Sequence, residues 1–468
     1  MLKNTLFMLA SNALRLLTGV VLLLLLARFW GAETFGKFMY PFTLAGLTVI
    51  LVDYGFNLQV VRDIGKDPGH VHYITCKALT IKLYLTIGML LVGGIIFWIF
   101  PLLGEYRMTF CLLWIANVFN SFGVLFNLAF RGLELFNKEV VITFYSNVIT
   151  FILIGILVWV GYGPVGIAVG FVLAKAFFMA ISWYQYSFVV AEDKFKCSKW
   201  SVVISSLSQG FPFAIHVALG TLYFQVDTII IEHFLGAKSV GIYQSALRVM
   251  IAGLIMTDVI SNVYLPRMAK SLYETESLTT LGTCMTRYCL CIGVIGLVVM
   301  SSGGDWIVDI LYGGGEYKRV ATLFPLFGVV LLLRYLGASY GIILTASNRQ
   351  TVRMVAVSLS FVVSIGLNFW LVPKMGLVGA LFASIVTHIF LTIVYILFAW
   401  KQTGSWLIDI RSIILLGIAL TALYSSNFLS PVFVLIVSVV SVALVGVTKT
   451  DWNQILKFQI RRTPVAGI

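Results

Sequence analysis

The chain has 468 residues, of which 60% are hydrophobic and only 11% are charged. A soluble globular protein carries about 25% charged residues, and a disordered chain combines low hydrophobicity with high net charge, so both classes are excluded. The formal net charge of +13 fits basic cytoplasmic loops and attraction to anionic membrane lipid, and we expect no nucleic-acid partner.

Apolar runs recur along the whole chain, and about 20 such residues suffice to cross a bilayer as a helix. They predict an all-α, polytopic membrane protein with about 14 transmembrane helices. The N-terminal run lacks a small-residue cleavage site, so we expect an uncleaved first span. The predicted spans are 5–28, 38–61, 79–101, 108–130, 140–161, 164–189, 203–231, 240–266, 284–301, 321–345, 352–372, 376–400, 409–427 and 429–447.

Basic residues in short loops set the orientation of a membrane protein, because Lys and Arg collect on the cytoplasmic side. The N-terminus, the even-numbered loops and the C-terminal tail contain 18 of them, whereas the odd-numbered loops contain 7. We therefore expect both termini to be cytoplasmic.

Signals for metal, cofactor or catalytic chemistry are missing from the sequence. The six cysteines form no C-x-x-C pair, and no histidine follows them at zinc-ligand spacing, so we expect neither disulfides nor a metal. There is no Walker loop and no catalytic constellation. We expect no cofactor and no enzyme activity.

An internal repeat is the most informative feature of the sequence. Residues 29–36 read FWGAETFG and residues 234–241 read FLGAKSVG, a separation of 205 positions. The matches include Asp, Asn and Arg, which are rare in membrane spans. The same separation pairs Asp53 with Asp258, Asn57 with Asn262 and Arg62 with Arg267.

The repeat makes spans 1–6 equivalent to spans 7–12 in the same orientation. It predicts two parallel six-helix repeats around a central cavity, and transporters built in this way bind their substrate between the halves. The expected parts are an N-lobe (1–200), a C-lobe (201–402), and a third part (403–468) with spans 13 and 14 and the tail.

Ionisable residues within the predicted spans are candidates for function, because an ionised side chain at mid-bilayer costs about 2.5–3.5 kcal/mol. Arg15 and Asp53 lie at similar depth on either side of the first turn, and Asp227 and Arg248 do the same in spans 7 and 8. Each pair is either a structural salt bridge or a cavity-lining arginine whose acid partner yields to an anionic substrate. Both interpretations stay open.

Further candidates come from the second half of each repeat. Lys175 and His388 are equivalent at a separation of 213 positions, which places them on opposite walls of the expected cavity. The predicted interior is cationic, which suits a lipid pyrophosphate or an acidic glycan. The substrate-binding candidates are Arg15, Lys175, Arg248 and Arg334, and the candidates for ion coupling or structural pairing are Asp53, Asp227, Asp258, His216 and His388.

Several motifs resemble those of a known family. The run ARFWGAETFG at 27–36, the Asp53-Tyr54-Gly55 turn and Arg62-Asp63 are similar to the N-terminal signature of Wzx-type polysaccharide exporters. That family belongs to the multidrug/oligosaccharidyl-lipid/polysaccharide superfamily. The stretch Arg131-Gly132-Leu133-Glu134 fits its pattern as well.

The resemblance implies a flippase that moves undecaprenyl-pyrophosphate-linked oligosaccharide across the bacterial inner membrane by alternating access. Its product would enter the synthesis of O-antigen, capsule or exopolysaccharide. The expected partners are this substrate, membrane lipid and other polysaccharide-assembly proteins. In related lipid II flippases the last two spans form a groove for the lipid tail, and spans 13 and 14 would do likewise.

Other functions are kept as alternatives. Lipid II flippases carry a second arginine in span 1, where this sequence has Val20 and Val21, so the resemblance favours an oligosaccharide flippase. A multidrug or cation exporter of the same superfamily needs an acidic chamber, and the basic residues within the spans disfavour it. A glycan polymerase needs a large external loop, and the predicted external loops are short.

Overall fold

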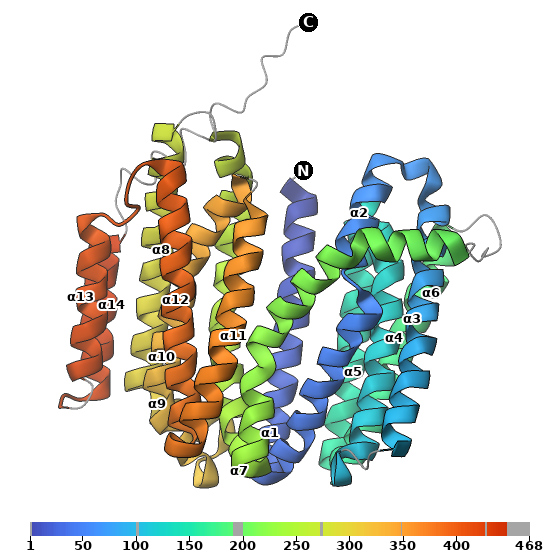
Figure 1. Cartoon of the computed structure of the whole chain (residues 1–468). Coiled ribbons are helices and arrows are strands. Elements are labelled where there is room, and N and C mark those ends of the chain that lie inside the picture. Colours follow the sequence, from blue (N-terminus) through green and yellow to red (C-terminus); the bar gives the residue numbers. More distant parts are fainter. Residues whose placement is uncertain are drawn as a thin grey trace, which may run out of the picture. The chain divides into compact units, whose positions relative to one another are not determined.

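The computed structural model describes residues 2–99, 103–190, 200–271, 275–347, 349–425 and 428–446, and all of its regular elements there are helical (Figure 1). The helices are α1 (Leu2–Asp53), α2 (Phe56–Lys66), α3 (Val71–Ile99), α4 (Arg107–Gly132), α5 (Phe136–Trp159), α6 (Pro164–Val189), α7 (Trp200–Lys270), α8 (Thr275–Ser302), α9 (Gly304–Tyr312), α10 (Lys318–Ala346), α11 (Gln350–Met375), α12 (Leu377–Thr403), α13 (Ile410–Ser425) and α14 (Pro431–Gly446). The described residues also include the 3-10 turns η1 (Pro68–His70), η2 (Gly104–Tyr106) and η4 (Gly315–Tyr317).

The helices confirm an all-α, multi-pass membrane protein. Within the described residues, 10 helical stretches are long and apolar enough to cross a membrane. The helices α13 and α14 are also apolar but have only 16 residues each. The predicted span 1 and most of the predicted span 2 lie in α1, and the predicted spans 7 and 8 both lie in α7.

Two glycines interrupt the two longest helices. Gly31 in α1 has φ 75° and Gly236 in α7 has φ 76°, a region that glycine enters without steric cost. In Figure 1 the helices α1 and α7 both reverse direction near the lower edge of the picture. The two breaks are 205 positions apart, as the repeated FWGAETFG and FLGAKSVG motifs predict. We call this end of the first unit the Gly31 end.

The predicted second span, 38–61, is too long. The helix α1 ends at Asp53, and the left-handed residues Tyr54 (φ 47°) and Gly55 (φ 70°) redirect the chain into the separate helix α2. The buried side chains of α2 are Phe56, Val60 and Ile64, which follow one another every four positions and so lie on one face of the helix. The helix α2 is therefore amphipathic. The amphipathic α2 is therefore a separate helix and does not continue the span.

Contacts divide the chain into two units, Met1–Ala252 with Ile365–Ala380, and Gly253–Ser364 with Leu381–Ile468. In the first unit α4 packs against α6, α1 and α2. In the second unit α8 packs against α10, and α13 and α14 pack against α8. The part of α7 up to Ala252 thus groups with α1–α6.

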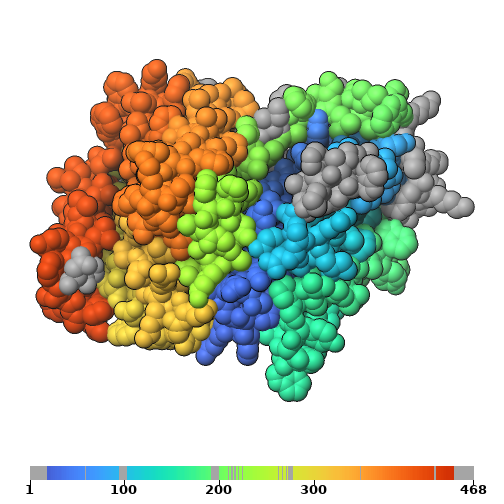
Figure 2. Space-filling model, turned by 60° about the horizontal axis from the view of Figure 1, so that its bottom comes forward, coloured from blue at the N-terminus to red at the C-terminus, as the bar shows by residue number. Residues whose placement is uncertain are grey.

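Within the first unit, α1 and α7 cross at a close backbone contact. A Cβ atom on Gly36 would lie 1.7 Å from the carbonyl oxygen of Ala237, and one on Gly241 would lie 1.8 Å from that of Ala32. Small residues four apart permit this approach of two membrane helices. Figure 2, which turns this end forward, shows the blue surface of α1 beside the yellow-green surface of α7. The repeated motif therefore encodes a reciprocal helix crossing.

Candidate functional site

A buried lysine and an aspartate form the most complete polar site in the first unit. Lys82 on α3 is fully buried, and its Nζ donates to Asp53 Oδ1 at 2.7 Å, to Ser121 Oγ at 2.8 Å and to the Ser121 carbonyl oxygen at 3.1 Å. The Ser121 hydroxyl also donates to Asp53 Oδ1. All three ammonium protons thus have acceptors, as a buried cation requires.

The helix ending places the acid of this site. Asp53 is the last residue of α1, directly before the left-handed turn at Tyr54 and Gly55. A carboxylate at a helix C-terminus is disfavoured by the helix dipole, and the charge of Lys82 offsets that cost. The Asp53 side chain keeps 28% of its surface exposed while Lys82 keeps none. The acid is therefore the member of the pair that a solute can reach.

This pairing differs from the sequence-based expectation. We expected Arg15 to be the partner of Asp53, but the side chain of Arg15 lies outside the described part of the chain. Lys82 was not among the predicted site residues. The internal repeat contained a signal for Lys82, because Lys82 and Arg287 are 205 positions apart, as are Asp53 and Asp258.

A second polar site joins the two halves of α7 with α11. The buried Asp227 accepts hydrogen bonds from the Tyr243 hydroxyl at 2.7 Å and from Asn368 Nδ2 at 2.9 Å. Next to it, Gln244 Nε2 donates to the Thr228 hydroxyl at 2.6 Å. Arg248, the predicted mate of Asp227, donates to Gln244 Oε1 at 3.1 Å. The predicted pair, Asp227 and Arg248, therefore takes part in neighbouring hydrogen bonds that join the helix halves before and after Gly236.

The second unit brings together three predicted site residues. Arg334 on α10 lies within electrostatic range of Asp258 on α7 and of His388 on α12. The buried His388 contacts the Ser384 carbonyl oxygen through Nδ1 at 2.8 Å. The half-buried Lys175 lies in the first unit, with its Nζ 5.9 Å from the centre of the Phe178 ring. The side chain of His216 lies outside the described residues, so its predicted role stays a prediction.

The equivalent of Lys82 in the second unit takes a different partner. Arg287 Nη2 donates to Asp409 Oδ2 at 2.7 Å, and the Ser412 amide donates to Asp409 Oδ1 at 2.9 Å, so the acid also caps α13. Burial acts to raise the pKa of Asp409. The hydrogen bonds from Ser412 and the charge of Arg287 outweigh it and hold that pKa below its ordinary value. The predicted C-terminal hairpin thus supplies the acid for Arg287.

Comparison with known proteins now decides the family. A family model described as "Polysaccharide biosynthesis protein" matches residues 1–272. The chain belongs to this family. The resemblance seen in the motifs is thereby confirmed, and it extends from α1 through both helical breaks.

Two relatives with known names are similar to this chain. The chain is 28% identical over 194 residues to the capsular polysaccharide biosynthesis protein CapF of Staphylococcus aureus. This match covers 40% of this chain and 48% of CapF. It is 26% identical over 341 residues to a "putative O-antigen transporter" of Shigella dysenteriae, covering 69% of this chain and 82% of that protein. The match to CapF thus spans about half of that relative's length.

Solved structures show the same fold. The lipid II flippase MurJ in an inward closed conformation matches 98% of this chain and 100% of its own, with a TM-score of 0.70 and 15% identity. An inward-facing multidrug transporter of the MATE family matches 86% of this chain and 94% of its own, with a TM-score of 0.67 and 15% identity. This polysaccharide biosynthesis protein therefore has the fold of the MOP superfamily.

Proposed function

We propose that this member of the polysaccharide biosynthesis family is a flippase for lipid-linked oligosaccharide. It moves an undecaprenyl-pyrophosphate-linked unit across the bacterial inner membrane by alternating access, for the assembly of O-antigen, capsule or exopolysaccharide. The observation that carries this proposal is that Lys175, Arg248 and Arg334, all within membrane-spanning helices, are each only half-buried. A basic group that keeps accessible surface at membrane depth is suited to an anionic ligand.

Arginine suits the pyrophosphate of such a substrate, because its guanidinium group binds phosphate bidentately and stays charged when desolvated. In this proposal Arg15, Lys175, Arg248 and Arg334 contact the pyrophosphate. Asp53, Asp227, Asp258, His216 and His388 orient these groups or couple transport to an ion.

The proposed architecture is two parallel six-helix lobes followed by a C-terminal hairpin. Division of α1 at Gly31 and of α7 at Gly236 supports this count, since it turns the long helices into two spans each. With α13 and α14 the total is fourteen, and both termini are then cytoplasmic. A two-lobed arrangement of this kind opens alternately to the two sides of the membrane.

Depletion of the protein in its host tests the function. We expect lipid-linked oligosaccharide to accumulate on the cytoplasmic face, and a copy of the gene carrying Lys175→Ala or Arg334→Ala should fail to clear it at normal protein level. Lys401→Ala is the control, because Lys401 lies in the last turn of α12 and is exposed. Normal turnover of the intermediate in depleted cells would refute the proposal.

Native mass spectrometry of the purified protein separates the two candidate functions. A co-purifying lipid pyrophosphate supports the flippase. A bound organic cation in its place would favour a multidrug exporter, the alternative that the same fold allows.

A further inference from the structure

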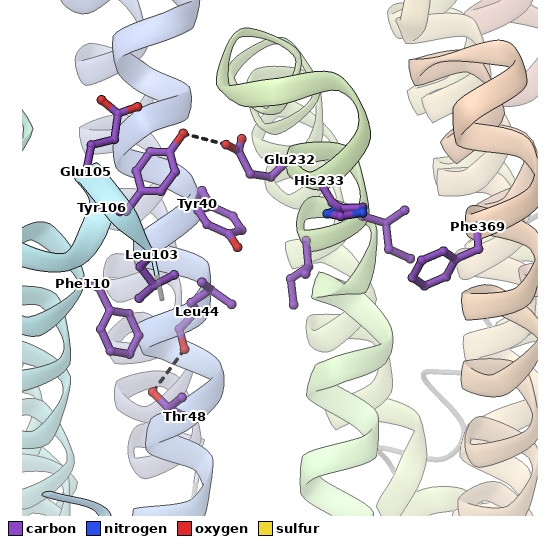
Figure 3. Close-up of a pocket in the computed structure, with 13 residues that line it drawn as sticks. Tyr40, Leu44, Thr48, Leu103, Glu105, Tyr106, Phe110, Glu232, His233 and Phe369 are labelled. Atoms are coloured by element: carbon purple, nitrogen blue, oxygen red, sulfur yellow. Dashed lines mark hydrogen bonds between the residues drawn. The ribbon is translucent and has the colours of Figure 1, made fainter. Parts of the chain in front are cut away.

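A cavity at the Gly31 end of the first unit is not used by the cationic residues of the proposed function. Its volume is about 880 Å³, within the range of small-molecule sites. It opens between α1 just after Gly31, the start of α4, α7 just before Gly236, and α11 (Figure 3). Its lining includes Tyr40, Glu105, Tyr106, Phe110, Glu232 and Phe369.

One hydrogen bond crosses this cavity. The Tyr106 hydroxyl donates to Glu232 Oε1 at 2.6 Å, and Figure 3 shows the two side chains reaching toward each other from different helices. The second carboxylate oxygen, Oε2, is enclosed and has no hydrogen-bond partner among the described residues. An acceptor left in this state costs about 1–3 kcal/mol, so Glu232 gains free energy from a ligand that brings a further donor.

Aromatic rings form the walls beside this acceptor. The Tyr40 and Tyr106 rings meet edge to face, with their centroids 5.2 Å apart. The rings of Phe110 and Phe369 also line the cavity. Such rings offer an apolar face next to the polar tips of the tyrosines.

The charge of the cavity differs from that of the basic sites within the spans. Lys37 Nζ lies 3.6 Å from Glu105 Oε2 and 3.3 Å from Glu33 Oε1. The carboxylate of Glu105, which lines the cavity, therefore has a cation beside it. Glu232 is held by a neutral hydroxyl, with no ion pair to a described residue. The Glu232 carboxyl group brings no positive charge to the cavity, and in its ionised form it repels phosphate. A pyrophosphate group is therefore a poor ligand for this cavity.

We propose that this cavity binds a neutral sugar residue of the transported oligosaccharide, at a site separate from the pyrophosphate. The inference rests on the proposed flippase function and assigns the glycan part of its substrate. A sugar ring presents hydroxyl donors along its edge and C–H groups on its faces, which match the carboxylate and the aromatic walls. When a sugar hydroxyl adds a donor beside the Tyr106 hydroxyl, a turn of the Glu232 carboxyl group gives each of its two oxygens a donor.

Comparison of the two repeats supports a dedicated site. The turn η4 carries the same Gly-Glu-Tyr sequence as η2, 211 positions later. In the second unit, however, Tyr317 is buried and stacks on Tyr312 with the ring centroids 4.8 Å apart. The position of α1 that corresponds to Glu232 is Ala27. The open Tyr106 comes from the first repeat and the acid Glu232 from the second, and the equivalent pair of positions, Tyr317 and Ala27, has neither feature, so the site does not follow from the duplication.

Binding of two lipids to the purified protein tests this assignment. The probes are lipid-linked oligosaccharide extracted from depleted cells and undecaprenyl pyrophosphate without sugar, measured by native mass spectrometry. We expect Glu232→Ala and Tyr40→Ala to weaken binding of the glycosylated lipid at least tenfold and to leave the sugar-free lipid unchanged. Tyr106→Phe should weaken the glycosylated lipid several-fold, whereas the matched control Tyr317→Phe should have no effect.

The outcomes distinguish this inference from the function on which it rests. If the wild-type protein binds neither lipid, the flippase proposal itself is wrong. If it binds both lipids but the Glu232 and Tyr40 variants bind the glycosylated lipid normally, the sugar site is wrong. An equal loss of both lipids, or displacement of the glycosylated lipid by tetraphenylphosphonium through Glu232, would also overturn the assignment.

Discussion

At the scale of single residues, the buried pair of Lys82 and Asp53 shows how the spans tolerate charge. The lysine is enclosed and the aspartate keeps 28% of its side-chain surface exposed. Removal of one partner from a buried pair leaves an uncompensated charge, and the cost depends on how well that charge can be rehydrated. The two halves of this pair should therefore respond unequally to substitution.

We expect Asp53→Ala to destabilise the protein by about 3–5 kcal/mol, because it strands the enclosed ammonium group of Lys82. Lys82→Met should cost less, about 1–3 kcal/mol, since Asp53 can turn toward water. Thermal unfolding of the purified variants in detergent measures both, and the double variant should be more stable than Asp53→Ala alone. An equal loss in the two single variants would contradict this account.

The partners of single side chains were only partly predictable from the sequence. The repeat predicted the equivalence of Asp53 and Asp258, because rare acids recur at one separation. The repeat did not predict that Lys82 is the partner of Asp53. The depth of Asp53 in the hairpin of spans 1 and 2 gives no information about a residue on a third helix, here α3. Tyr106 and Glu232 are 126 positions apart, and no local pattern links them.

At the scale of helices, the sequence predicted only part of the breaks and crossings. The repeated glycine motif predicted a turn, and the structure confirms it at Gly31 and Gly236. The motif did not reveal that Gly36 and Gly241 form the contact between the two helices, because the same glycine spacing also occurs in loops. The separate helix α2 was missed because its buried face continues the apolar run of the preceding span.

The crossing of α1 and α7 predicts a strong positional difference between glycines of the same helix. Gly36→Ala would place a Cβ 1.7 Å from a backbone carbonyl oxygen, so we expect a loss of about 3 kcal/mol as the helices separate. Gly46→Ala is the matched control, because a Cβ there meets no atom within 4 Å, and it should be neutral or stabilise by up to about 1 kcal/mol. Thermal unfolding in detergent checks the pair, and similar losses would exclude this crossing.

The docking of α13 on α8 predicts a pH dependence. The folded pKa of Asp409 lies below its ordinary value, because the Ser412 hydrogen bonds and Arg287 outweigh the effect of burial. Its contribution is therefore present above the unfolded pKa of about 3.9 and is lost as the pH falls through the folded value. Asp409→Asn should cost about 1–3 kcal/mol at pH 7.

Unfolding of the wild-type protein and Asp409→Asn across pH 3–8 measures this effect. The stability difference should stay constant from about pH 5 upward and shrink below about pH 4. Ser425→Ala, at the other end of α13, serves as a control without an acid-dependent difference. A difference that persists unchanged at pH 3 would show that Asp409 does not act through its charge.

At the scale of the whole molecule, composition alone identified a polytopic helical membrane protein, because burial of long apolar runs leaves few alternatives. The division into two units was less predictable. It depends on where α7 and α11 exchange neighbours, and apolar helices carry little sequence information about their partners. The orientation in the membrane follows from loop charges and can be tested without any ligand.

We expect the Gly31 end to face the cell exterior and α2 to lie at the cytoplasmic end. In a variant without native cysteines, Glu33→Cys should react with a membrane-impermeant maleimide added to intact cells, because the Glu33 side chain is 62% exposed. Lys66→Cys, on an exposed residue of α2, should react only after the cells are opened. Labelling of Lys66→Cys in intact cells would invert the orientation and would move the proposed sugar site to the entry side of the membrane.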